Sequence, residues 1–173
     1  MKIFCFLSLC ILFIQQGNAK TYHVGEGYAF SSIKPAIEMA QSMDSIVVHG
    51  GIYTEGNIIV DKPLFIIGEN WPVLDGEKKY EVLSIKANHV FISGFKIQFS
   101  GHASLNDPCG IKVYDSQYVH IIDNELADNF FGIYLLGKNG FNDRIIFSVC
   151  RLNVKLNGIF GFNLILYPCI PDG

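Results

Sequence analysis

The feature that most constrains the fold of this chain is a repeat of short apolar segments. One set aligns at intervals of 26, 29 and 26 residues and comprises residues 64–66, 90–92, 119–121 and 145–147. A second set recurs at 22 and 26 residues and starts at Gly110, Gly132 and Gly158. Repeats of about 20–30 residues, with short strands divided by turns, are typical of β-solenoids, in which each rung buries its apolar face against the next. The sequence therefore predicts an all-β chain folded as a parallel β-helix, right-handed because parallel crossovers have that sense.

The shared register also predicts which side chains face inward, because side chains alternate across a strand. One inward column should contain Ile66, Ile92, Ile121 and Phe147, the next should contain Val90 and Val119, and Phe91 and His120 should face outward. A β-sandwich, the alternative fold, also has short strands but predicts no common register.

The residues between the repeated segments are typical of tight turns. Glycine tolerates positive φ at sharp corners, which is the expected role of Gly68, Gly76, Gly94 and Gly132. Asparagine can bond to nearby backbone or stack between rungs, which is the expected role of Asn88, Asn124 and Asn129.

A single helical segment precedes the strands, which begin at about residue 45. A helix over residues 31–43 is expected because apolar residues follow the i, i+3, i+4, i+7 pattern after two serines that can cap its start. Met39 and Met43 should pack on the solenoid. The helix would cover the open N-terminal end, where strand edges and core would otherwise be exposed.

The first nineteen residues read as a secretory signal, with a basic residue, an apolar stretch over residues 3–14 and a small residue, Ala19, at the expected cleavage point. A membrane anchor is the alternative, but the stretch is shorter than the roughly 20 residues that a bilayer requires. Removing residues 1–19 takes away one of 13 basic residues and leaves 12 against 16 acidic ones, a formal charge of −4. One exported domain, residues 20–173, is expected, and its acidic balance does not favour nucleic acid as a partner.

The residues available for metal binding are few and scattered. Cys109, Cys150 and Cys169 would remain after cleavage, an odd number with spacings of 41 and 19 residues that match no common zinc pattern. His102 and Cys109 share one polar segment between repeats, so this pair is the predicted metal site, with copper as the possible ion.

Several stretches resemble one known family. They include DSIVVHGGIY at residues 44–53, GENWPVLDG at residues 68–76, ISGFKI at residues 92–97 and DNFFGIY at residues 128–134. Together they are similar to NosD, a family of right-handed β-helix proteins, over about residues 29–136. The resemblance implies a periplasmic, non-enzymatic accessory protein that works with ABC transporter subunits and other pathway proteins to mature the copper centre of nitrous oxide reductase.

The alternative function is a secreted β-helix that binds or degrades polysaccharide, since both roles occur on this fold. Catalysis would need outward carboxylates, for which Asp107, Asp115, Asp123, Glu125 and Asp128 are available, although turn positions explain most of them. Sugar binding would need an outward row of aromatic rings, for which the candidates are Tyr114, Tyr118 and Tyr134. Residues 137–173 depart from the family pattern, so a truncated or degenerate copy is a third interpretation.

Overall fold

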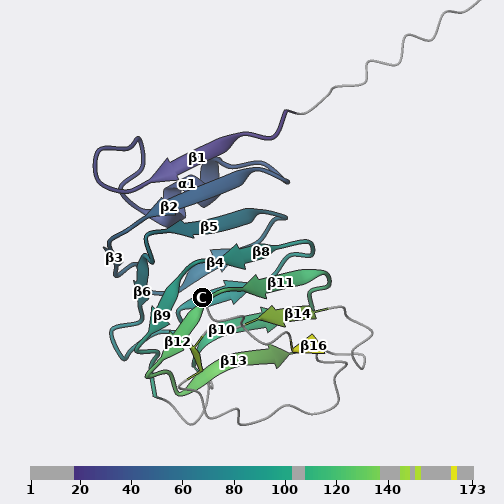
Figure 1. Ribbon diagram of the computed structural model, residues 1–173. Coiled ribbons are helices and arrows are strands. Elements are labelled where there is room, and N and C mark those ends of the chain that lie inside the picture. Colours follow the sequence, from purple (N-terminus) through teal and green to yellow (C-terminus); the bar gives the residue numbers. More distant parts are fainter. Residues whose placement is uncertain (1–17, 103–107, 137–144, 149–150, 153–164, 167–173) are drawn as a thin grey trace, which may run out of the picture.

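The computed structural model describes residues 18–102, 108–136, 145–148, 151–152 and 165–166. Its strands form three parallel sheets that run along one axis, with successive rungs stacked on one another, as expected for a β-helix (Figure 1). Sheet A contains, in spatial order, β1 (Thr21–Val24), β2 (Ser45–His49), β5 (Phe65–Glu69), β8 (Phe91–Ser93), β11 (Val119–Ile122), β14 (Ile145–Ser148) and β16 (Ile165–Leu166). Sheet B contains β3 (Ile52–Tyr53), β6 (Val73–Asp75), β9 (Lys96–Gln98), β12 (Glu125–Ala127) and β15 (Arg151–Leu152). Sheet C contains β4 (Ile58–Val60), β7 (Leu83–Ile85), β10 (Cys109–Tyr114) and β13 (Phe131–Leu136).

The predicted register of sheet A is confirmed. Ile66 pairs with Ile92, Ile92 with Ile121, and Ile121 with Phe147, all in parallel. The first three side chains are at most 3% exposed, whereas the side chain of Phe147 lies outside the described residues. Because every pairing among these segments is parallel, the β-sandwich alternative is wrong.

The neighbouring positions follow the same alternation. Val90 and Val119 are buried, and the outward pair Phe91 and His120 is partly exposed, with ring centroids 6.3 Å apart. The second predicted set is also in register where it is described, since Ile111 pairs with Ile133 in sheet C. Its third segment, from Gly158, lies outside the described residues.

Asparagine side chains connect successive rungs at the turns, as predicted. Asn124 is fully buried and accepts a hydrogen bond from the Phe95 N–H at 3.1 Å, while its amide donates to the carbonyl of Ile92 at 3.0 Å. Asn88 and Asn129 likewise accept from backbone N–H groups of the adjacent rung. These bonds satisfy backbone groups that the irregular corners leave outside the strand ladders.

The glycine prediction is only partly correct. Of the four glycines, Gly94 has a positive φ, +80°, and the other three do not. At Gly68 the requirement is space instead, because a Cβ there would collide with the carbonyl oxygen of Gly94 in the next rung. The two corners stack too closely for a side chain.

The helix α1 (Ile33–Met39) is shorter than predicted and is capped differently. Neither predicted serine supplies the cap: the N-cap residue Ser32 makes no side-chain hydrogen bond to the helix. Instead the Glu55 carboxylate accepts from the N–H groups of Ile33 at 2.6 Å and Lys34 at 3.0 Å. A carboxylate is favourable there because a helix N-terminus presents unpaired donors and partial positive charge.

The two methionine predictions are wrong. Met39 is the last helical residue and is 62% exposed, and Met43 lies in the following turn with φ +71° and is 49% exposed. The packing face of α1 consists of Ile33, Ala36 and Ile37, so the helix does bury an apolar stripe, but the methionines are outside it.

The first rung begins before the helix, which the sequence did not indicate. Strand β1 pairs with β2, and Asp44, 3% exposed, ties the two strands together. The Asp44 carboxylate accepts from the N–H groups of Lys20 at 2.7 Å and Gln41 at 2.8 Å. These two bonds hold the pKa of Asp44 below its ordinary value, despite its burial. Residues 1–17 of the predicted signal segment, which spans residues 1–19, lie outside the described residues.

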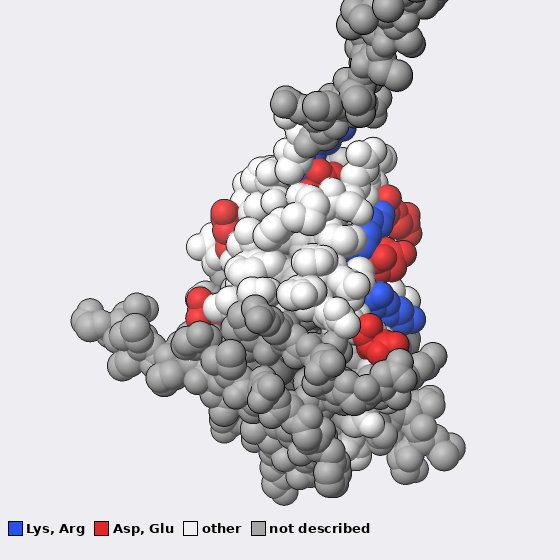
Figure 2. Space-filling model, turned by 90° about the vertical axis from the view of Figure 1, so that its right-hand side faces the viewer, with Lys and Arg blue, Asp and Glu red and all other residues white. Residues whose placement is uncertain are grey.

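Charged side chains are unevenly distributed over the surface. On the side shown in Figure 2, most of the described surface is uncharged, and basic and acidic groups alternate along one margin. The described residues on that side therefore form no patch of a single sign. No helix in the described part of the chain is long and apolar enough to cross a membrane.

Candidate functional site

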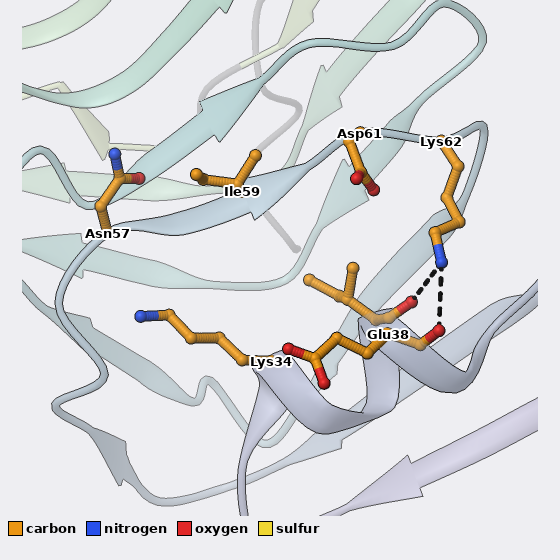
Figure 3. Close-up of a pocket in the computed structure, with 7 residues that line it drawn as sticks. Lys34, Glu38, Asn57, Ile59, Asp61 and Lys62 are labelled. Atoms are coloured by element: carbon orange, nitrogen blue, oxygen red, sulfur yellow. Dashed lines mark hydrogen bonds between the residues drawn. The ribbon is translucent and has the colours of Figure 1, made fainter.

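A groove of about 470 Å³ lies between α1 and the outward face of β4. Figure 3 shows its two sides, with Lys34 and Glu38 on the helix facing Asn57, Ile59 and Asp61 along the strand. Ile59 points outward because its neighbours Ile58 and Val60 fill the core, and it is 42% exposed. The groove therefore has an apolar patch bordered by polar groups, as ligand sites commonly do.

The two lysines of the groove are already engaged. The Lys62 ammonium donates to the last carbonyls of α1, at 2.8 Å from Ile37 O and 3.2 Å from Glu38 O (Figure 3). Lys34 donates to the carbonyl of Glu55. Glu38 and Asp61 are exposed, so carboxylates supply the accessible charge.

A compact polar cluster adjoins the groove on sheet C. The Ser84 hydroxyl donates to Asn57 Oδ1 at 2.9 Å and contacts the carboxylate of Glu81. Asn57 also lines the groove, so the groove and the cluster share a residue. The parallel register explains this proximity, because Ile59 pairs with Ser84, and Ser84 pairs with Lys112 one rung further on.

The centre of the cluster is an ion pair covered by aromatic rings. The Lys112 ammonium is 3.4 Å from Glu81 Oε2, and the two side chains are 9% and 11% exposed. The same ammonium lies 5.4 Å from the ring centroid of Tyr114 and 5.1 Å from that of Tyr134, distances at which cation–π attraction operates. The Tyr114 hydroxyl donates to Glu81 at 3.2 Å.

The electrostatics of this cluster keep both partners of Glu81 protonated. Burial is the largest single effect on the pKa of Lys112 and lowers it, but the charge of Glu81, the groups of Tyr114 and Cys109 and the hydrogen bond to Glu81 together outweigh burial, so the net pKa is raised. Burial and then the charge of Glu81 raise the pKa of Tyr114. The cluster is therefore a fixed array of donors and aromatic faces.

The predicted aromatic row is present in part. Tyr114 and Tyr134 lie on the outward face of sheet C, since they alternate with the inward residues Val113 and Ile133, and both flank Lys112. Tyr118 does not join them. It lies in the turn before β11 and stacks on His89, with ring centroids 4.7 Å apart.

The predicted metal pair is divided between core and surface. Cys109 is fully buried at the start of β10, whereas His102 is exposed and contacts the edge of the Phe130 ring. Residues 103–107 between them lie outside the description, so this site stays a prediction. Within the described part of the chain, no group of three or more His, Cys, Asp or Glu side chains could hold a metal ion.

Of the acidic residues named from the sequence, three are turn residues and Glu125 is the first residue of β12. Asp115, Asp123 and Asp128 are exposed and have positive φ, and Glu125 pairs with Lys96 at 3.7 Å. Asp107 lies outside the described residues. Sequence reasoning missed Glu81 and Lys112, although an alternation of buried and polar residues at 111–114 indicated which side chains would face outward.

Comparisons with known proteins show no family for this chain. The fold defines a parallel β-solenoid, which agrees with a β-helix family in general. No protein-family model matches the chain, and no solved structure matches it. A 64-residue segment is 39% identical to F-box only protein 10 of Mus musculus. That alignment covers 36% of this chain and 7% of the mouse protein.

Proposed function

We propose that the outward face of sheet C, together with the groove beside α1, binds a neutral oligosaccharide. The observation that carries the proposal is the shared residue Asn57, which joins a groove with an apolar patch to a cluster flanked by two tyrosine rings. Sugar rings present apolar faces that stack on aromatic side chains, and hydroxyl groups that pair with carboxylates and amides.

The preference for a neutral ligand follows from which charges remain accessible. Both groove lysines donate to backbone carbonyls, and Lys112 is paired with Glu81, while Glu38 and Asp61 are exposed. Lys86 is exposed on the face of sheet C, with its ammonium 5.2 Å from the Tyr114 ring centroid, but in the groove itself an acidic sugar would meet carboxylates whose neighbouring lysines are already engaged. We propose binding rather than cleavage because Glu81, the carboxylate beside the two tyrosine rings, is already engaged by Lys112, Ser84 and Tyr114.

A glycan array and titration calorimetry test this proposal. Neutral oligosaccharides should bind, and uronic-acid oligosaccharides of equal length should not. Tyr134→Ala should weaken binding about tenfold, the equivalent of roughly 1–1.5 kcal/mol for one aromatic stack. Tyr118→Ala is the matched control, because it removes an exposed tyrosine at another corner. Equal losses in the two variants, or binding confined to acidic sugars, would contradict the proposal.

We also propose, as a second candidate, the NosD role: a periplasmic accessory protein that acts with an ABC transporter in maturing the copper centre of nitrous oxide reductase. Its support is the resemblance over about residues 29–136 and the parallel solenoid that this resemblance implies. Genes for nitrous oxide reductase and an ABC transporter beside this one, and loss of reductase copper on its deletion, are the expected findings. A deletion strain with full reductase activity would contradict it.

A further inference from the structure

A second group of chemically active side chains lies on sheet A, away from the proposed sugar site. His23 is the third residue of β1, and His49 and Glu69 are the last residues of β2 and β5. Strands β1, β2 and β5 lie side by side (Figure 1). Parallel strands bring their carboxyl ends to one edge of a sheet, so the three side chains come together there.

The nitrogen atoms of the two histidines are placed for chelation. His23 Nδ1 lies 3.0 Å from His49 Nε2. Two nitrogens that are each about 2.0–2.1 Å from one metal ion are separated by about 2.8–3.4 Å in square or tetrahedral geometry. In this hydrogen bond one of the two nitrogens carries the proton, so metal binding requires His23 to hold its proton on Nε2 instead, by exchange with solvent, and its exposed ring to turn the Nδ1 lone pair toward the ion.

The other nitrogen of His49 has the partner that metal-binding histidines typically use. His49 Nδ1 lies 3.3 Å from Glu69 Oε2, an ion-pair distance at which the carboxylate favours a proton on Nδ1 and so leaves the lone pair on Nε2. The carboxylate therefore selects the tautomer that can bind a metal through the nitrogen facing His23.

The position of His49 is held from two further directions. The Tyr28 ring stacks on its imidazole, with centroids 4.1 Å apart and an angle of 3° between the planes. The buried Tyr53 hydroxyl donates to the backbone carbonyl of His49 at 2.8 Å. A ligand fixed in this way loses little conformational freedom on binding.

We propose that His23 and His49 bind one divalent transition-metal ion, with Glu69 orienting His49. Two imidazole ligands favour copper(II) over zinc(II), in line with the general order of affinities. No third protein ligand occurs among the described residues, so water or an incoming group completes the coordination. This site does not depend on the proposed sugar binding.

Calorimetric titration of the full chain, carrying a tag without histidine, with copper(II) chloride and separately with zinc chloride tests the site. One equivalent should bind, copper more tightly than zinc. His23→Ala and His49→Ala should each weaken copper binding at least tenfold. Glu69→Gln, which keeps both ligands, should weaken it about tenfold through the lost orientation. His89→Ala is the matched control, because His89 also stacks on a tyrosine but has no described histidine partner.

A second measurement needs no variant and guards against misfolding. Substoichiometric copper(II) should broaden the amide signals of the wild-type chain around residues 23–28 and 49–51 in NMR spectra. Broadening centred on His102 would overturn the proposal in favour of the site predicted from the sequence. Unchanged affinity in both histidine variants, an equal loss in His89→Ala, or no binding of either metal would also overturn it.

Discussion

Replacing Asn124 by alanine tests how strongly the turns hold adjacent rungs together. The side chain is fully buried and makes hydrogen bonds with Phe95 N–H, with the carbonyl of Ile92 and, at 2.9 Å, with the carbonyl of Ile122. Alanine leaves the buried Phe95 N–H without this partner, which costs about 1–2 kcal/mol of stability. It also removes one hydrogen bond from each of the two carbonyls, which costs about 0.5–1 kcal/mol for each bond. The free energy of unfolding should therefore fall by about 2–4 kcal/mol.

Urea unfolding followed by far-ultraviolet circular dichroism measures this loss. Asn88→Ala is the control, because Asn88 is exposed and bonds one N–H, that of Gln117, so the expected loss is below about 1 kcal/mol. In a thermal scan, Asn124→Ala should lower Tm by roughly 5–15 °C at this chain length. The reasoning would be refuted if the two variants lost the same stability within about 0.5 kcal/mol.

Three further predictions concern residues that stabilise the solenoid around the sites. Glu55→Ala should destabilise the chain by about 1–2 kcal/mol because Glu55 caps α1, whereas Ser32→Ala should change stability by less than about 0.5 kcal/mol, as measured by urea unfolding. The pKa of Asp44 is lower in the folded chain than its ordinary value of 3.8, so the ionised carboxylate stabilises the fold at pH values above 3.8. This contribution is lost as the pH falls through the lower, folded-state pKa, and Asp44→Asn should therefore flatten the acid side of the stability–pH profile. Gly68→Ala should lower the urea midpoint far more than Gly51→Ala, because an added Cβ at Gly51 makes only ordinary contacts.

The solenoid and its inward columns could be predicted because they depend on a single variable, the repeat length. Once residues 66, 92 and 121 share a register, alternation decides which side chains are buried. The asparagine bonds between rungs followed from the same argument, since equivalent turns lie one above another.

Contacts that cross the rungs at irregular offsets could not be predicted. The cap of α1 is Glu55, which lies 22 residues after Ile33, between β3 and β4, and local capping rules point to the serines instead. Strand β1 was missed because it is short and precedes the helix, outside both aligned repeats.

The candidate sites were missed for the same physical reason. Glu81 lies between strands, so no repeat fixes its position beside Lys112. His23 and His49 are 26 residues apart and meet only because β1 pairs with β2. Nothing around either histidine in the sequence indicates a metal site, and the pairing of the strands is what brings the two imidazoles within reach of one ion.

A crystal structure of residues 20–173 is the most direct test of the central claim, that one parallel register fixes both the core and the outward faces. The account predicts Ile66, Ile92 and Ile121 stacked in one inward column, with His120 outward and Lys112 beside Glu81 on the face of sheet C. Antiparallel pairing among these strands, or a buried His120 beside an exposed Ile121, would contradict it.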